Sequence, residues 1–145
     1  MIPPQRWEKD GFVVSTDPAM LDPEFVVRAL HGSYWANERP REVILRSLVA
    51  PASVNFGLYE TAAGRQIGFA RVVTDHATFS WLCDVLVAEE WRGRGLGTWM
   101  IACVVSHPCV KHVRTTLGTQ DAHGLYEKFG FERRERMTRP ADSRT

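Results

Sequence analysis

Cysteine is scarce in this sequence and follows no pattern of known chemical use. Its three cysteines, Cys83, Cys103 and Cys109, match neither a Cys-x-x-Cys spacing nor the Cys and His spacing of a metal site. The absence of such spacing argues against a disulfide framework and against a zinc site. We therefore expect reduced thiols, no bound metal and a cytoplasmic protein.

Long apolar segments are also missing. The longest uninterrupted apolar run, residues 99–105, is too short to span a bilayer. Residues 1–10 lack the apolar stretch of a secretory leader, and the chain contains no internal repeats. We expect no membrane partner, and a single domain over residues 1–145 that ends in a disordered tail from about residue 138.

The chain has no strong charge of one sign. Its formal net charge is +1 at pH 7, which argues against nucleic acid as a partner. With 145 residues, of which 44% are hydrophobic and 24% charged, the chain has the composition of an ordinary globular domain. Composition therefore indicates one apolar core and leaves the function to the motifs.

Glycine is concentrated in one segment, Arg92-Gly93-Arg94-Gly95-Leu96-Gly97. The apolar, β-branched residues 81–87 before it predict a strand, and residues 98–105 after it predict an apolar helix. Glycine has no Cβ and tolerates positive φ, so backbone amides at this helix start can approach a phosphate. Arg92 and Arg94 either add positive charge to such a site or are solvated loop residues. The segment therefore predicts a phosphate-binding loop.

The spacing of this loop separates it from two other phosphate-binding motifs. A dinucleotide fingerprint read from Gly93 would need glycine where Thr98 stands, and a Walker loop needs a nearby lysine that is absent. What remains, Arg-x-x-Gly-x-Gly, resembles the pyrophosphate loop of the GNAT superfamily of acetyl-CoA-dependent N-acetyltransferases. A second family signature, Leu/Phe-Tyr-x-x-x-Gly-Phe, is matched downstream by Leu125, Tyr126, Gly130 and Phe131. Together the two motifs cover about the last half of the chain, residues 79–135.

The resemblance implies an α+β fold with a mixed, mostly antiparallel sheet and flanking helices. The expected order of elements agrees: strand, two helices, three strands, helix, strand, helix and strand. The strands before the last are expected at residues 12–15, 54–59, 66–74, 79–87 and 113–117. Asp22 as N-cap and Pro23 predict the start of the first helix, and the second follows Pro40. By resemblance, the fourth and fifth strands, 79–87 and 113–117, splay apart to form the coenzyme cleft.

Acetyl-CoA is the acyl donor that the resemblance implies. The backbone of Val85, Leu86 and Val87 would bind its pantetheine arm, while the valine side chains can still belong to the core. Its pyrophosphate would bind the loop formed by Arg92, Gly93, Arg94, Gly95, Leu96, Gly97 and Thr98. Five arginines near the C-terminus are interpreted as solvated, with contact to the 3′-phosphate of the coenzyme as the alternative: Arg133, Arg134, Arg136, Arg139 and Arg144.

Two residues are candidates for the catalytic chemistry. Tyr126 stands where the family commonly places the proton donor for the leaving thiolate, and otherwise packs against the sheet. Asp84 is a carboxylate within an apolar strand; it either serves the acceptor amine or makes a structural ion pair, for example with Arg71. His123, three residues before Tyr126, is either a further base or a capping residue. A covalent route through Cys83 is disfavoured, since an apolar strand is a poor place for a thiolate.

The acceptor is an amine of a small molecule or of a protein, and no motif identifies it. Tyr34, Trp35 and Glu38 join the first two helices, where aromatic surface and a negative charge suit a cationic amine. The alternative is a loop whose aromatic residues fill the core. A homodimer is compatible with the chain. The alternative function is a non-catalytic coenzyme-A-binding sensor or assembly module, although the presence of Tyr126 favours an N-acetyltransferase.

Overall fold

The computed structural model of this chain describes residues 2–142. Within them the strands form one sheet in the order β1-β2-β3-β4-β5-β6. Every neighbouring pair is antiparallel except β5 and β6, which run parallel. The strands are β1 Arg6–Lys9, β2 Phe12–Ser15, β3 Ser53–Glu60, β4 Arg65–Thr74, β5 Phe79–Val87 and β6 Arg114–Leu117. The predicted α+β class and the mixed, mostly antiparallel sheet are thereby confirmed.

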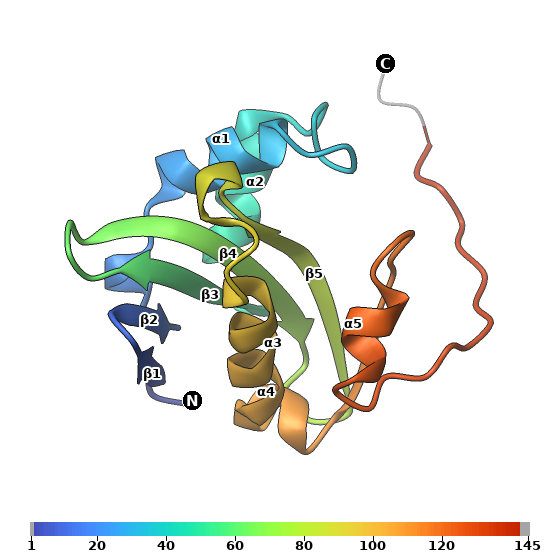
Figure 1. The fold of residues 1–145 in the computed structure, drawn as a ribbon. Helices are drawn as coiled ribbons and strands as arrows, with labels where there is room; N and C mark the ends of the chain where they lie inside the picture. Colours follow the sequence, from blue (N-terminus) through green and yellow to red (C-terminus); the bar gives the residue numbers. More distant parts are fainter. Residues whose placement is uncertain (1, 143–145) are drawn as a thin grey trace.

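Helices cover both faces of the sheet (Figure 1). On one face, Val26 and Ile44 of the first two helices pack against Phe69. On the other face, Met100 of the third helix packs against Val72. The helices are α1 Pro23–His31, α2 Arg41–Val49, α3 Leu96–Ser106, α4 Pro108–Lys111 and α5 His123–Glu127, with 3-10 turns η1 Pro18–Met20 and η2 Glu89–Trp91.

The start of α1 follows directly from its sequence. The Asp22 side chain accepts hydrogen bonds from the backbone N–H groups of Glu24 and Phe25 at 3.1 and 3.2 Å. Pro23 occupies the first helical turn, where a missing N–H costs nothing. The predicted N-cap is therefore confirmed, and it sets the point from which α1 crosses the sheet.

A bulge interrupts β5 at Asp84. In the ladder with β4, Ala70 alone lies opposite two residues, Asp84 and Val85. Asp84 has a φ of 55°, in the left-handed region that residues other than glycine rarely occupy. Because of the extra residue, Leu82 packs with α3 whereas Leu86 packs with α1 and α2. The bulge thus changes which face of the sheet the following residues meet.

The pairing of β5 with β6 covers only the first part of β5. Residues 79–82 pair with residues 114–117 of β6. Residues 83–87 have β4 on one side and, within residues 2–142, no strand on the other. Backbone groups on that side lack a strand partner, and such groups need another partner when they are buried. The splaying of the two strands stays a prediction.

One expected strand is absent from the described residues, and one observed strand was not expected. In the described part of the chain no strand follows α5, because residues 128–142 form neither helix nor strand. The segment 132–136 consists of exposed glutamates and arginines, so it has no apolar face that could be buried against β6. Conversely, β1 was not expected; its residues are mostly exposed, so no apolar alternation indicates it. Residues 138–142 are exposed, residues 143–145 lie outside the described part, and a disordered tail stays a prediction.

Candidate active site

The glycine loop joins the end of β5 to α3 through η2. Gly93 and Gly95 have φ values of 79° and 77°, a left-handed conformation that glycine adopts without strain. Gly95 is the N-cap of α3 and offers no side chain to cap it. The first N–H groups of α3 therefore have no partner within the helix, and they lie at the positive end of its dipole. This is the geometry of an anion site at a helix start.

A cavity of about 320 Å³ opens at this loop. Most of the residues predicted to bind the coenzyme meet around it: Val87, Arg92, Gly93, Gly95, Leu96, Gly97 and Thr98. Arg94, Val85 and Leu86 do not line it. Val85 packs towards α3, and Leu86 is buried against α1 and α2. Val85 and Leu86 are predicted to bind the coenzyme through their backbone groups, and the positions of their side chains do not test this prediction.

Two residues of this cavity were not predicted from the sequence. Trp91 lines it from the turn before the loop, and Leu125 lines it from α5. The guanidinium of Arg94 lies over the Trp91 ring at 4.6 Å from its centroid. Trp91 could have been predicted from the sequence, because it is an aromatic residue directly before a basic glycine loop. Leu125 shows that α5 reaches the loop cavity, which spacing along the chain does not reveal.

Both arginines of the loop are exposed to solvent, and each also makes one contact with the protein. Arg92 donates from Nε to the backbone carbonyl of Val87 at 2.9 Å, which ties the loop back to the end of β5. Arg94 stacks on Trp91, an arrangement that stabilises a guanidinium by a cation–π interaction. Both contacts tie the loop to neighbouring groups, and Arg92 brings a positive charge to the cavity.

Tyr126 lies on α5 and is 8% exposed. Its ring packs edge-on against Phe131 at 5.8 Å between centroids. Burial raises the pKa of its hydroxyl, and the nearby charge of Asp121 raises it further. The hydroxyl is therefore protonated at neutral pH, as a proton donor must be. The packing role and the catalytic role are both compatible with this position, and the catalytic role stays a prediction.

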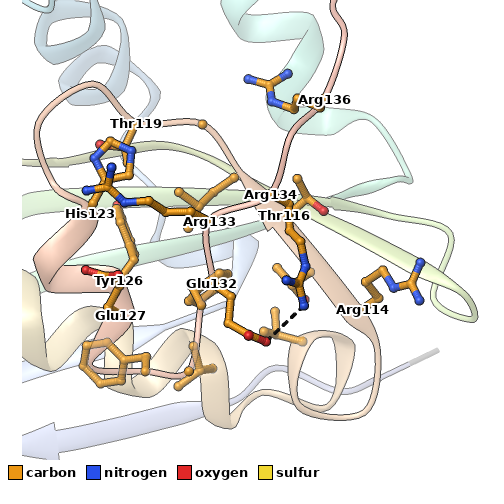
Figure 2. Close-up of a pocket in the computed structure, with 18 of the residues that line it drawn as sticks. Arg114, Thr116, Thr119, His123, Tyr126, Glu127, Glu132, Arg133, Arg134 and Arg136 are labelled. Carbon is orange, nitrogen blue, oxygen red and sulfur yellow. Dashed lines mark hydrogen bonds and ion pairs between the residues drawn. The ribbon is translucent and has the colours of Figure 1, made fainter.

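A larger cavity, of about 1130 Å³, lies beyond β6 (Figure 2). β6, α5 and the segment after α5 enclose it, with Thr119 and His123 towards one end and Arg114 towards the other. His123 is the first residue of α5 and lines this cavity together with Tyr126. The hypotheses that His123 is a base and that the C-terminal arginines contact a 3′-phosphate stay predictions.

Asp84 is engaged by three partners. Its Oδ2 accepts from Arg71 Nε at 3.1 Å and from Arg39 Nη1 at 3.0 Å. Its Oδ1 accepts from Trp35 Nε1 at 3.1 Å. The ion pair with Arg71 was one of the two sequence hypotheses, whereas Arg39 and Trp35 were not connected to Asp84. Because both oxygens accept hydrogen bonds, this is the arrangement of a structural ion pair; a catalytic role for Asp84 stays a prediction.

The loop between α1 and α2 carries its aromatic residues on the surface. Tyr34 is 58% and Trp35 42% exposed, and their rings meet edge-on at 5.1 Å between centroids. The alternative in which they fill the core is therefore wrong; Ala36 is the buried residue of this loop. Glu38 is exposed as well. All three predicted acceptor residues are accessible, and their binding role stays a prediction.

Cys83 lies in the middle of β5 and is half-buried. Burial raises the pKa of its thiol to about 11. A thiol with this pKa is almost entirely protonated at neutral pH, and the thiolate is the nucleophile. The environment thus argues against covalent acyl transfer through Cys83, in agreement with the sequence interpretation.

Within residues 2–142, no three His, Cys, Asp or Glu side chains gather as a metal site would require. In the same residues, no helix has the length and apolar character needed to cross a membrane.

Comparison with known proteins gives a consistent result. The model of the acetyltransferase (GNAT) domain matches residues 52–133. FG08082 of Gibberella zeae, a protein named as an acetyltransferase, is 32% identical over a match that covers 68% of this chain. This chain spans 64% of the length of that protein.

Solved structures show the same fold. A crystal structure from Xanthomonas campestris pv. campestris, of a protein named as an acetyltransferase of the GNAT family, is 36% identical with a TM-score of 0.83. The match covers 92% of this chain and 96% of that one. A Staphylococcus aureus structure is 24% identical, covers 92% of this chain and 99% of its own, and has a TM-score of 0.71. At that identity the second likeness concerns the fold alone.

Proposed function

Because this chain belongs to the acetyltransferase (GNAT) domain family, we propose that it transfers an acetyl group from acetyl-CoA to the amine of an acceptor. The observation that carries the proposal is the uncapped start of α3 behind the left-handed glycines Gly93 and Gly95. Its unpaired N–H groups face a cavity that also reaches Val87 at the end of β5. A pyrophosphate at the loop and an extended arm along β5 fit this arrangement.

The donor is held by groups that the fold leaves without partners. Residues 83–87 have no strand neighbour on the β6 side among the described residues. Their backbone N–H and C=O groups are suited to the amides of the pantetheine arm. The coenzyme supplies the acetyl thioester. The backbone of residues 85–87 orients the thioester, and the loop from Arg92 to Thr98 binds the phosphates of the coenzyme.

The chemistry exchanges one bond for another. The acceptor amine gives up a proton to water, its nitrogen forms a bond to the acetyl carbon, and the carbon–sulfur bond breaks; solvent then returns the proton that Tyr126 donates. A backbone N–H of the unpaired part of β5 stabilises the oxyanion. Tyr126 then gives its proton to the leaving sulfur, because burial keeps the hydroxyl protonated at neutral pH. The products are the acetylated amine and coenzyme A.

A thiol-release screen tests the proposal. The protein is incubated with acetyl-CoA and, in turn, polyamines, amino acids, aminoglycosides, amino sugars and peptide N-termini, and free thiol is measured. We expect amine-dependent release with at least one class. Calorimetry with coenzyme A in parallel separates the alternatives: binding without release from any amine supports the non-catalytic module, and absence of both contradicts the assignment of the loop.

A further inference from the structure

The cluster around Asp84 has more positive than negative charge. A single carboxylate is shared by two guanidinium groups, those of Arg39 and Arg71. No other ion pair of either arginine occurs among residues 2–142. Arginine stays charged at all physiological pH values, so the cluster carries a net charge of about +1 when Asp84 is ionised. The Asp84 side chain is 2% exposed, which leaves the excess charge with the arginines at the mouth of the cluster.

Both arginines also keep unused hydrogen-bond donors. A guanidinium has five N–H groups. Arg39 uses Nη1 for Asp84, and Arg71 uses Nε for Asp84 and Nη1 for Ser53. The remaining N–H groups have no hydrogen-bond partner among the described residues. The side chains are 26% and 15% exposed, respectively, so a ligand can reach them from solvent. Planar, partly desolvated donors with excess positive charge are suited to a carboxylate or a phosphate.

The position of this cluster connects it to the proposed acyl donor. Asp84 directly precedes the β5 residues assigned to the coenzyme arm, and the bulge at Asp84 lies within the part of β5 that has no β6 partner. The same carboxylate accepts the indole N–H of Trp35, so the exposed Tyr34–Trp35 pair borders the cluster. A positive cluster also lowers the pKa of a nearby ammonium group, which favours the neutral, nucleophilic amine.

We propose that the acceptor is a small amine that carries an anionic group, a carboxylate or a phosphate, which Arg39 and Arg71 bind. The inference rests on the acetyltransferase function proposed above and specifies its substrate class. It also differs from the cationic acceptor that Glu38 suggests in the sequence. Glu38 is exposed and makes no ion pair with the cluster in the described structure, whereas the cluster beside β5 has a net positive charge.

Matched amines test the inference on the unaltered protein. Thiol release from acetyl-CoA is measured with phenylalanine against 2-phenylethylamine, and with glucosamine 6-phosphate against glucosamine. Within each pair only the anionic group differs, and the two pairs distinguish a carboxylate from a phosphate. We expect kcat/KM to be roughly 10- to 100-fold higher for the anionic member of at least one pair, the effect of hydrogen bonds to a charged group.

Equal or faster turnover of the two amines that lack the anionic group would overturn the inference and leave the acetyltransferase function standing. Absence of release from every amine, with coenzyme A still bound in calorimetry, would contradict both. The wild-type comparison needs no variant, so a folding defect cannot mimic either result.

Arg39→Gln identifies the binding residue. Arg71 still neutralises Asp84 in this variant, and we expect KM for the preferred anionic amine to rise roughly 10- to 100-fold with kcat little changed. The kcat/KM for the partner amine that lacks the anionic group should stay the same, and Arg39→Lys should restore part of the loss. Arg41→Gln is the matched control, because Arg41 is an exposed arginine two residues away that pairs with Glu24. Equal losses for both amines in Arg39→Gln would mean that Arg39 only supports the loop, and would contradict the inference.

Discussion

The indole N–H of Trp35 donates to Asp84 Oδ1 at 3.1 Å, although 49 residues separate the two in the sequence. This hydrogen bond connects the exposed loop between α1 and α2 to the bulge of β5. Through it, the aromatic pair on the surface and the strand assigned to the acyl donor are held in one arrangement. Any change at Asp84 is therefore expected to affect both.

Asp84→Asn should lower the free energy of unfolding by about 3 kcal/mol, because it leaves two guanidinium groups without their buried counter-charge. Urea unfolding monitored by tryptophan fluorescence measures the change. Glu38→Gln serves as the control, since Glu38 is exposed and unpaired in the described residues, and should change stability by less than about 0.5 kcal/mol. Equal stability of Asp84→Asn and the wild type would mean that the ion pairs contribute nothing to the fold.

Gly95→Val should weaken coenzyme A binding at least tenfold, as measured by calorimetry. A β-branched residue does not tolerate a φ of 77°, so the loop must shift away from the phosphates. Gly64→Val is the matched control: Gly64 has a φ of 67° in the turn between β3 and β4, far along the chain from the glycine loop. Both variants should lose a similar 1–2 kcal/mol or so of stability. If Gly64→Val lost as much coenzyme affinity as Gly95→Val, general strain would explain the effect.

Tyr126→Phe should lower the rate of acetyl transfer by roughly 10²–10⁴-fold and leave coenzyme affinity unchanged, because only the proton donor is removed. The raised pKa of Tyr126 implies that the hydroxyl is protonated throughout the neutral range. Single-turnover measurements across pH are required, since product release can limit kcat. Tyr59→Phe is the control; the Tyr59 hydroxyl is buried and has no hydrogen-bond partner in the described structure. Wild-type single-turnover rates in Tyr126→Phe would show that Tyr126 is a packing residue.

Acidification should destabilise the protein through His107. This side chain is 2% exposed, and burial, with a smaller contribution from the charge of His76, lowers its pKa. The folded state keeps His107 neutral, whereas the unfolded chain takes up a proton near the ordinary value of about 6.5. The contribution is therefore fully present above about pH 6.5 and is lost as the pH falls below it, towards the lower pKa of the folded state.

Urea unfolding at pH 7.5 and 5.5 measures this loss. His107→Asn is the matched variant, because an Asn oxygen can replace the Nδ1 that accepts the Cys109 N–H at 3.0 Å, yet it does not titrate. We expect the wild type to lose more stability than the variant between these pH values, by up to about 1 kcal/mol per pH unit. Identical pH dependence would assign the effect to other groups.

Local patterns determined most of the elements. β2 and β5 have the bounds that their apolar residues predict, Phe12–Ser15 and Phe79–Val87, and Asp22 caps α1 as expected. The glycine loop was predicted because its conformational requirement, positive φ at two positions, is written in residue type. The prediction of a strand after α5 was wrong because the charged segment there has no apolar face to bury. The order of elements in a fold family does not provide such a face.

By itself, the sequence determined the conformation of the glycine loop, the α+β class and the need of a buried Asp84 for a positive partner. Only the tertiary structure decided which partners it has. Arg71 was foreseen because it lies on the neighbouring strand, but Arg39 and Trp35 reach Asp84 across 45 and 49 residues. Such contacts depend on how α1 and α2 pack on the sheet and on the bulge that directs Asp84 towards them. Residue spacing records local hydrogen bonds and periodicity, whereas the pairing of distant charges is set by the packing of whole elements.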